Sequence, residues 1–163
     1  MFISYNEAEH FSYEDCVIRE FKIENDSICV TAEALIVEPD NSQNSNYTRS
    51  YADTATISFE GARVINAVKE GFRRYDADDR LLEEIPDRTL DGDETKNLLS
   101  GLCDQYLYDL IQAGINGEER NYVLGIEMVT DDITGADADS YQILIQCTGM
   151  TVSWERYLNR TFM

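Results

Sequence analysis

The sequence predicts an α+β domain: a mainly antiparallel β-sheet of six or seven strands with one long amphipathic helix packed on it. Three observations predict this fold class. Apolar and polar residues alternate in several segments before residue 70 and again after residue 120. Between these segments, apolar residues recur at intervals of three and four. A chain of 163 residues, 43% of them hydrophobic, suits a single domain over residues 1–163.

The first two strands are predicted at residues 16–23 and 28–37, joined by a tight turn. The turn is centred on Asn25 and Asp26, which tolerate a positive φ. Its register gives the hairpin one mostly apolar face. The expected pairs are Ile23 with Ile28, Phe21 with Val30, Arg19 with Ala32, and Val17 with Ala34.

Residues 38–50 hold Pro, Asn and Ser with few apolar side chains, which predicts a long surface loop. A third strand is expected at residues 54–59, ending at Gly61. Residues 62–68 are predicted as a fourth strand, although Val64, Ile65 and Val68 also suit one helical turn.

The long helix is predicted from Glu94 to Ala113. Asp91 and Glu94 have the spacing of a capping box, and Gly114 suits the left-handed residue that ends a helix. An apolar stripe at intervals of three and four favours packing on a sheet. The stripe comprises Leu98, Leu99, Leu102, Cys103, Tyr106, Leu107, Leu110 and Ile111.

Three more strands are expected after the helix, at residues 122–128, 141–147 and 150–158. Thr148 and Gly149 suit a turn that pairs Cys147 with Met150. This register sets Trp154 opposite Ile143 on an inner face, which predicts a core tryptophan. The predicted order is therefore three or four strands, a helix, and three strands.

Charge restricts the partners of this chain. Thirty-two acidic residues outnumber thirteen basic ones, giving a formal net charge of -19. A surface this negative repels nucleic-acid phosphates and anionic membranes, so we expect no direct nucleic-acid binding and no membrane association. No stretch approaches the roughly 18 apolar residues of a membrane helix, and the N-terminus lacks the features of a signal peptide. These features predict a cytoplasmic protein.

Few residues suggest chemistry. The four cysteines are scattered without a CxxC spacing, which predicts buried free thiols, no metal site and no cofactor. His10 is the only histidine, and its polar surroundings favour a surface position. No nucleophile, phosphate-loop or zinc motif accompanies it. We therefore expect a non-enzymatic binding or accessory protein, with a small hydrolase-like enzyme using a carboxylate pair as the alternative.

The acids concentrate at residues 76–94, which hold nine, and at residues 127–139, which hold five. Such tracts steer a basic protein partner, as in an acidic inhibitor or immunity-type protein. Two alternatives stay open: the tracts only keep the protein soluble, or residues 131–140 bind calcium, although their order differs from an EF-hand loop. The candidate partner-binding acids are Asp76, Asp78, Asp79, Asp131, Asp132, Asp137 and Asp139.

A second candidate surface combines aromatic and basic residues, which are enriched at interface centres. It comprises two segments, KEGFRRY at residues 69–75 and WERYLNR at residues 154–160. Tyr157 and Arg160 are the candidate partner-binding residues there.

Three stretches carry a family resemblance: YEDCVIREFKIENDSI (13–28), NYTRSYADT (46–54) and WERYLNR (154–160). In them the chain resembles a family of small, uncharacterised acidic bacterial proteins, some of which are labelled as similar to a subtilin biosynthesis sensor. The resemblance spans nearly the whole chain. It implies a bacterial origin and a single domain, and it implies no catalytic residue or cofactor.

Overall fold

A computed structural model describes residues 1–129 and 138–160, apart from the side chains of residues 138, 159 and 160. The described chain is mostly β-structure, with one α-helix, α1 (Gly92–Ser100), and one 3₁₀ turn, η1 (Ala8–His10). Its strands are β1 (Phe2–Tyr5), β2 (Phe11–Ser12), β3 (Val17–Glu24), β4 (Ser27–Glu33), β5 (Ile36–Val37), β6 (Ser50–Ala52), β7 (Ala55–Glu60), β8 (Arg63–Lys69), β9 (Phe72–Tyr75), β10 (Leu81–Ile85), β11 (Arg88–Thr89), β12 (Tyr106–Asn116), β13 (Glu119–Val129), β14 (Ala138–Cys147), β15 (Gly149–Trp154) and β16 (Tyr157–Arg160).

Ten strands form one antiparallel sheet in the order β1-β15-β7-β4-β3-β12-β13-β14-β8-β11. A smaller sheet has the order β16-β6-β5-β2, and β9 and β10 pair only with each other. The ten-stranded sheet has two halves, which we call the first half (β1, β15, β7, β4 and β3) and the second half (β12, β13, β14, β8 and β11). A single residue pair, Val17 with Tyr106, joins β3 to β12 between them.

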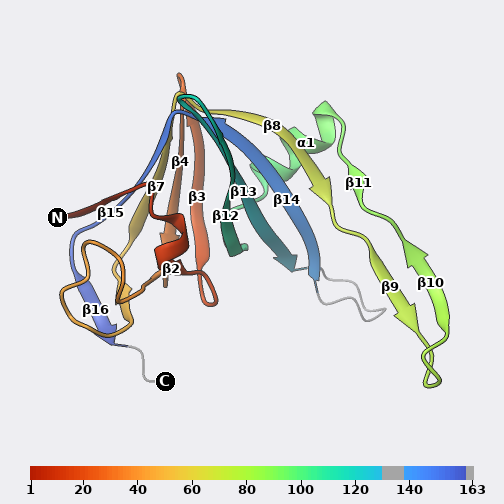
Figure 1. Cartoon of the computed structure of the whole chain (residues 1–163). Coiled ribbons are helices and arrows are strands. Elements are labelled where there is room, and N and C mark those ends of the chain that lie inside the picture. The colour runs from red at the N-terminus through yellow and green to blue at the C-terminus, as the bar shows by residue number, and fades with distance from the viewer. Residues whose placement is uncertain (130–137, 161–163) are drawn as a thin grey trace.

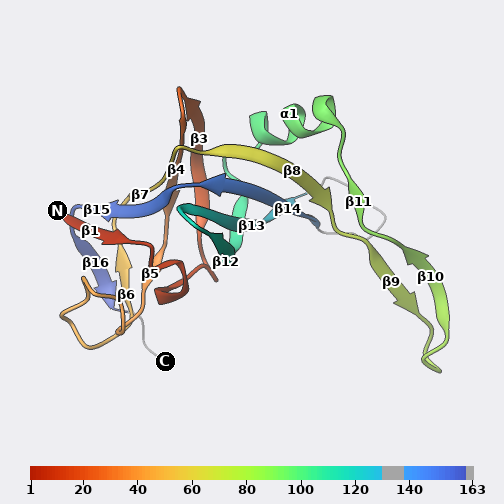
Figure 2. The same cartoon turned by 45° about the horizontal axis from the view of Figure 1, so that its top comes forward.

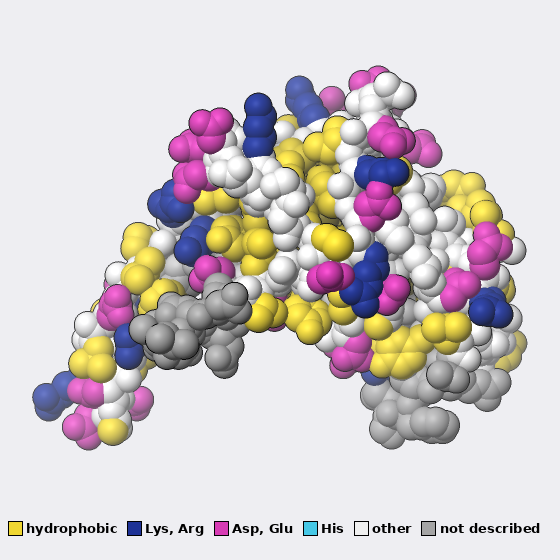
Figure 3. Space-filling model, turned by 180° about the vertical axis from the view of Figure 1, so that it is seen from behind, with side chains coloured by type: hydrophobic (Ala, Val, Ile, Leu, Met, Phe, Trp, Pro, Cys, Tyr) yellow, Lys and Arg dark blue, Asp and Glu magenta, His cyan; other side chains and the backbone are white. Residues whose placement is uncertain are grey.

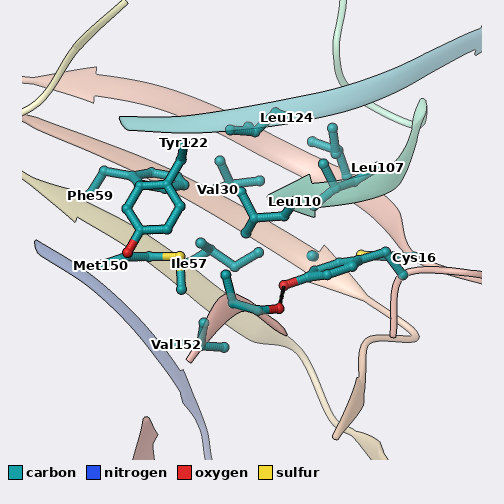
Figure 4. Packing of buried hydrophobic residues seen from close by; sticks show 14 of the residues in the cluster. Cys16, Val30, Ile57, Phe59, Leu107, Leu110, Tyr122, Leu124, Met150 and Val152 are labelled. Carbon is teal, nitrogen blue, oxygen red and sulfur yellow. Dashed lines mark hydrogen bonds between the residues drawn. The ribbon is translucent and has the colours of Figure 1, made fainter. Parts of the chain in front are cut away.

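The sheet folds over at this junction, so that the two halves share one core. In a flat sheet, four steps from β7 to β13 would separate them by about 19 Å. Instead the ring centroids of Phe59 and Tyr122, one from each strand, lie 5.6 Å apart. Figure 1 shows the strands converging at one end and spreading at the other. Tyr122 from β13 points toward Phe59 and Met150 of the first half in Figure 4, which shows this shared core.

Aromatic residues attach the small sheet to the large one. Trp154 is 2% exposed, and its ring stacks on Phe2 at 5.6 Å and meets Phe11 edge-on at 5.9 Å. The expectation that Trp154 is a core residue is therefore confirmed. The loop at residues 38–50 is also more organised than its composition suggests. Asn44 is buried, and its side-chain amide donates to the carbonyl groups of Val37, Glu38 and Thr48.

The predicted α+β class, with a long helix over Glu94–Ala113 on a six- or seven-stranded sheet, is wrong. The Asp91–Glu94 capping box is present, but α1 ends at Ser100 after nine residues, and residues 106–116 form β12. A β-bulge explains the error. It shifts the register between Leu107 and Asp109, so the inward-facing Leu107 and Leu110 lie three residues apart, as on a helix. Within the described residues, no helix is long and apolar enough to cross a membrane.

The register of the first hairpin is correct near its turn and wrong farther away. Ile23 pairs with Ile28 and Phe21 with Val30, as expected. A second bulge, between Ile18 and Glu20, then sets Ile18 opposite Ala32. Ile18 is therefore fully buried in the position that the register extrapolated from the turn predicts for Arg19.

The expected hairpin between residues 141–147 and 150–158 does not form. β14 pairs with β13 and β8 in the second half, whereas β15 pairs with β7 and β1 in the first. The chain crosses between the halves at Thr148, whose N–H donates to the carbonyl of Glu60. Trp154 thus lies opposite Phe2 rather than Ile143.

The β9–β10 hairpin projects from the second half, and we call residues 70–87 the arm (Figures 1 and 2). It continues β8 and β11 beyond the body of the sheet. A Cβ at Gly71 would lie 1.9 Å from the carbonyl oxygen of Ile85, so only glycine fits where the two arm strands come together. Every residue of β9 and β10 is exposed.

Candidate functional site

A cleft of about 800 Å³ lies between residues 8–14 and the middle of β12. One wall is the segment that contains η1 and β2. The other wall is formed by residues 108–114 of β12. We call this space the cleft.

The cleft exists because the sheet junction is short. Leu107 of β12 donates its N–H to the carbonyl of Cys16, the residue before β3. This is the last backbone hydrogen bond at the junction of β3 and β12. Beyond that point β12 pairs with β13 alone among the described strands. Residues 8–14 lie beside β12 without pairing with it, and Tyr13 holds them in place by donating to the carbonyl of Ala8 at 2.8 Å.

One edge of β12 therefore faces the cleft without a partner strand among the described residues. Its register with β13 is uninterrupted over four residues, from Asp109 to Gln112, between two bulges. At this edge, the Leu110 N–H donates to the carboxylate of its own neighbour Asp109, at 2.9 Å. A free strand edge offers backbone donors and acceptors that another extended chain can complete.

The lining of the cleft is acidic. Three carboxylates line it, from Glu9, Glu14 and Asp109, and no lysine or arginine does. Glu14 is ion-paired with Arg49 from outside the lining. Burial raises the pKa of Tyr13 well above its usual value, and the nearby charges of Asp109 and Glu9 act in the same direction. The phenol therefore stays protonated and adds no charge of its own.

Tyr108 fixes the position of this part of β12. Its ring covers Gly125 on β13, where a Cβ would lie 2.6 Å from the ring carbon bearing the hydroxyl. The Tyr108 hydroxyl donates to the carboxylate of Glu70 at 3.2 Å, and Gln142 donates to the same carboxylate. Burial and the Glu70 charge raise the pKa of Tyr108 to about 12. Tyr108 thus anchors β12 to β13, to β14 and to Glu70 at the base of the arm, on the side away from the free edge's own backbone groups.

The acids predicted from sequence lie elsewhere. Asp76, Asp78 and Asp79 form the turn at the tip of the arm. There the Asp76 carboxylate accepts the N–H groups of Asp78 and Arg80, at 2.8 and 2.9 Å, so it stabilises the turn itself. Asp139 lies on β14, with its carboxylate 3.6 Å from the Lys69 ammonium.

The other partner-binding residues predicted from the sequence do not form one surface with these acids. Asp131, Asp132 and Asp137 lie outside the described residues, as do residues 131–137 of the calcium loop proposed for residues 131–140. Tyr157 is half-buried against Phe2, and its hydroxyl donates to the carbonyl of Gln43. Arg160 of β16 pairs with Ser50 of β6, and β16 lies at the other end of the molecule from the arm (Figure 1).

The structure also places the histidine and the four cysteines. His10 is partly exposed in η1, with Nδ1 2.9 Å from Asp40 and Nε2 3.3 Å from Glu9. All four cysteines are free; Cys16 and Cys147 are buried as expected, whereas Cys103 is exposed. In the described part of the chain, no three His, Cys, Asp or Glu side chains come together in a group that could hold a metal ion.

Sequence reasoning missed the cleft because its walls are about a hundred residues apart. Glu9 and Asp109 share no local pattern, and only the β3–β12 junction brings their segments together. Comparisons with protein-family models, with curated proteins and with solved structures found no significant match for this chain.

Proposed function

We propose that this protein is a non-enzymatic binding protein that takes an extended basic segment of another protein into the cleft. One observation carries the proposal: an unpaired strand edge, Asp109–Gln112, lies in a cleft whose lining contains three carboxylates and no cation. The free edge favours an extended backbone, and the carboxylates favour Lys or Arg side chains.

Strand addition supplies affinity through the backbone, and the side chains supply specificity. A segment placed beside Asp109–Gln112 would pair with the backbone groups of β12 that face the cleft. Its alternate side chains would then reach Glu9 and Asp109. The exposed Ile111 lies on the same face as Asp109 and offers an apolar contact for the alkyl stem of a cationic side chain.

The charge of the whole chain supports the same class of partner. A net charge of -19 attracts a basic protein from a distance and speeds its encounter, in a way that salt weakens. The four free cysteines support a cytoplasmic setting for the complex, because thiols persist in reducing compartments.

The test uses a fluorescent peptide in which Arg alternates with Val, and an otherwise identical peptide with Glu in place of Arg. We expect the Arg peptide to bind the full chain by fluorescence anisotropy, with affinity that falls as salt rises, and the Glu peptide not to bind. The double variant Glu9→Gln with Asp109→Asn should weaken binding about fivefold to tenfold, as expected for the loss of partly exposed charge contacts. Asn at position 109 keeps an acceptor for the Leu110 N–H.

The matched control removes two carboxylates that lie outside the cleft, with Asp26→Asn and Glu118→Gln. Both residues are exposed in turns. This control should bind the Arg peptide with nearly wild-type affinity.

Hydrogen exchange of the wild-type chain with the Arg peptide bound should also show new protection at residues 109–112. Equal weakening by the two double variants, or protection only elsewhere, would contradict the proposal.

A further inference from the structure

The arm is the least buried ordered part of the described chain. Among the described strands, β9 and β10 pair with each other and with no other strand. Two-stranded hairpins that pack against nothing are marginally stable in water. In Figure 3 the arm extends from the body at the lower left, with hydrophobic, basic and acidic side chains along its length.

The arm also exposes a large apolar area for a surface hairpin. Its large apolar side chains are between 41% and 65% exposed: Phe72, Tyr75, Leu81, Leu82 and Ile85. A concentration of such side chains on one projection is typical of a contact surface. Burial against another chain would remove them from water.

Each strand of the arm has one free edge, and the basic one is the edge of β9 that faces away from β10. Its sequence is Phe72-Arg73-Arg74-Tyr75, four residues with two adjacent cations. Arg73 lies 3.0 Å from Glu84, and Arg74 lies 3.4 Å from Glu83. All four side chains are well exposed, so these pairs hold the arginines only weakly and leave them able to reach another acceptor.

This edge matches the cleft in length and in charge. β9 has four residues, and the uninterrupted open segment of β12 also has four, Asp109–Gln112. The two arginines are opposite in charge to the carboxylates of the cleft, and because adjacent strand side chains point to opposite faces, one of them would lie on the same face as Asp109. Because both edges lack a partner strand, one contact between them would satisfy two exposed strand edges at once.

We propose that β9 of one copy of this chain docks against the open edge of β12 in the cleft of a second copy. The inference rests on the proposed function, since it names a strand that the cleft accepts. Two copies that exchange arms make two such contacts and close the assembly, so the expected product is a reciprocal dimer.

The first experiment uses a labelled peptide of residues 68–77 as the probe. It should bind the full chain by anisotropy, and the version with Arg73→Ser and Arg74→Ser should bind at least tenfold more weakly. The cleft variant with Glu9→Gln and Asp109→Asn should lose affinity for the unaltered peptide, whereas the Asp26→Asn, Glu118→Gln control should keep it.

The second experiment measures the mass of the full chain by light scattering across a concentration series. The wild-type chain should form dimers. Replacing Arg73 and Arg74 by Ser should yield monomers. The control that replaces the exposed cations Lys96 and Arg156 by Ser, outside the arm, should still form dimers.

A charge-reversal pair makes the test specific to arm and cleft. One variant carries Arg73→Glu and Arg74→Glu, and the other carries Glu9→Lys and Asp109→Lys. Each alone should be monomeric, because both of its contacts are mismatched. A mixture should form heterodimers, since one contact becomes complementary with reversed charges and the other is wild type.

The outcomes separate this inference from the proposed function. A chain that binds the Arg peptide in the cleft, yet stays monomeric and ignores the 68–77 peptide, would overturn the arm inference and leave the proposed function standing. A dimer that survives both sets of charge changes would also overturn it. Failure of every peptide to bind would remove the proposed function as well.

Discussion

The β3–β4 hairpin and the arm begin from similar local chemistry and end in opposite environments. Each joins two adjacent strands through a short turn that contains a residue with positive φ, Asn25 at 53° and Asp79 at 60°. The β3–β4 hairpin places Ile28 and Val30 in the core at 0% exposure. The arm buries no side chain. Turn chemistry therefore forms both hairpins, and only tertiary packing distinguishes a structural element from an exposed one.

The difference in burial between the two hairpins suits one to stabilising the fold and the other to binding. The β3–β4 hairpin lies inside the ten-stranded sheet, between β7 and β12, and its apolar face belongs to the common core. The arm contributes little to that core, so its sequence can serve contact with another molecule. A substitution in the arm should therefore change the free energy of unfolding little and weaken binding to another molecule strongly.

The largest expected effect comes from truncating one apolar side chain in each hairpin. Ile28→Ala should lower the free energy of unfolding by about 2–5 kcal/mol, because it leaves a cavity in the core. Phe72→Ala on the arm should change it by less than about 0.5 kcal/mol, measured where the chain is monomeric. Urea unfolding of both variants provides the measurement. Similar losses for the two would mean that the arm packs into the body after all.

Alkaline pH should act on the body through Cys16, which precedes β3. Burial raises the pKa of this thiol from 9.0 to about 12. Above pH 9 the unfolded chain loses this proton while the folded chain keeps it, so the free energy of unfolding falls as pH rises. This thiol accounts for about 2 kcal/mol of the loss between pH 9 and pH 11.

Cys16→Ala should therefore flatten the dependence of stability on pH in that interval, measured by urea unfolding at several pH values. Cys103→Ala is the control, because this thiol is exposed. An unchanged slope in Cys16→Ala would show that the thiol ionises in the folded protein as readily as in the unfolded chain.

The smallest effect distinguishes the two turns. A β-branched residue strains a position with positive φ, so Asn25→Val should cost about 1 kcal/mol in global stability. Asp79→Val should leave the global unfolding transition unchanged and only speed hydrogen exchange within the arm. A global loss from Asp79→Val would indicate that arm and body unfold together.

Local signals in the sequence were informative where the backbone is regular. The turn at Asn25 and Asp26, the first pairs of the β3–β4 hairpin, the capping box at Asp91 and the buried Trp154 all agree with the structure. They depend on neighbours within a few residues or on strong apolar character, and both can be read from a single sequence.

Bulges and long-range crossings could not be read in the same way. The bulge between Leu107 and Asp109 gave a strand the spacing of a helix, and the bulge after Ile18 reversed the faces of β3. The β14–β15 connection looked like a hairpin because a turn sequence does not say which strands it leads to. The cleft could not be predicted from the sequence for the same reason, since Glu9 and Asp109 come to line one cleft only through the fold.

The position of β15 has a consequence for synthesis of the chain. β15, at residues 149–154, lies between β1 and β7, both of which are made far earlier. On the ribosome, the first half of the sheet must wait with an incomplete row of strands until residues 149–154 have emerged. The strands made first therefore cannot complete their sheet before this much later segment is available, and such non-local pairing makes folding slow.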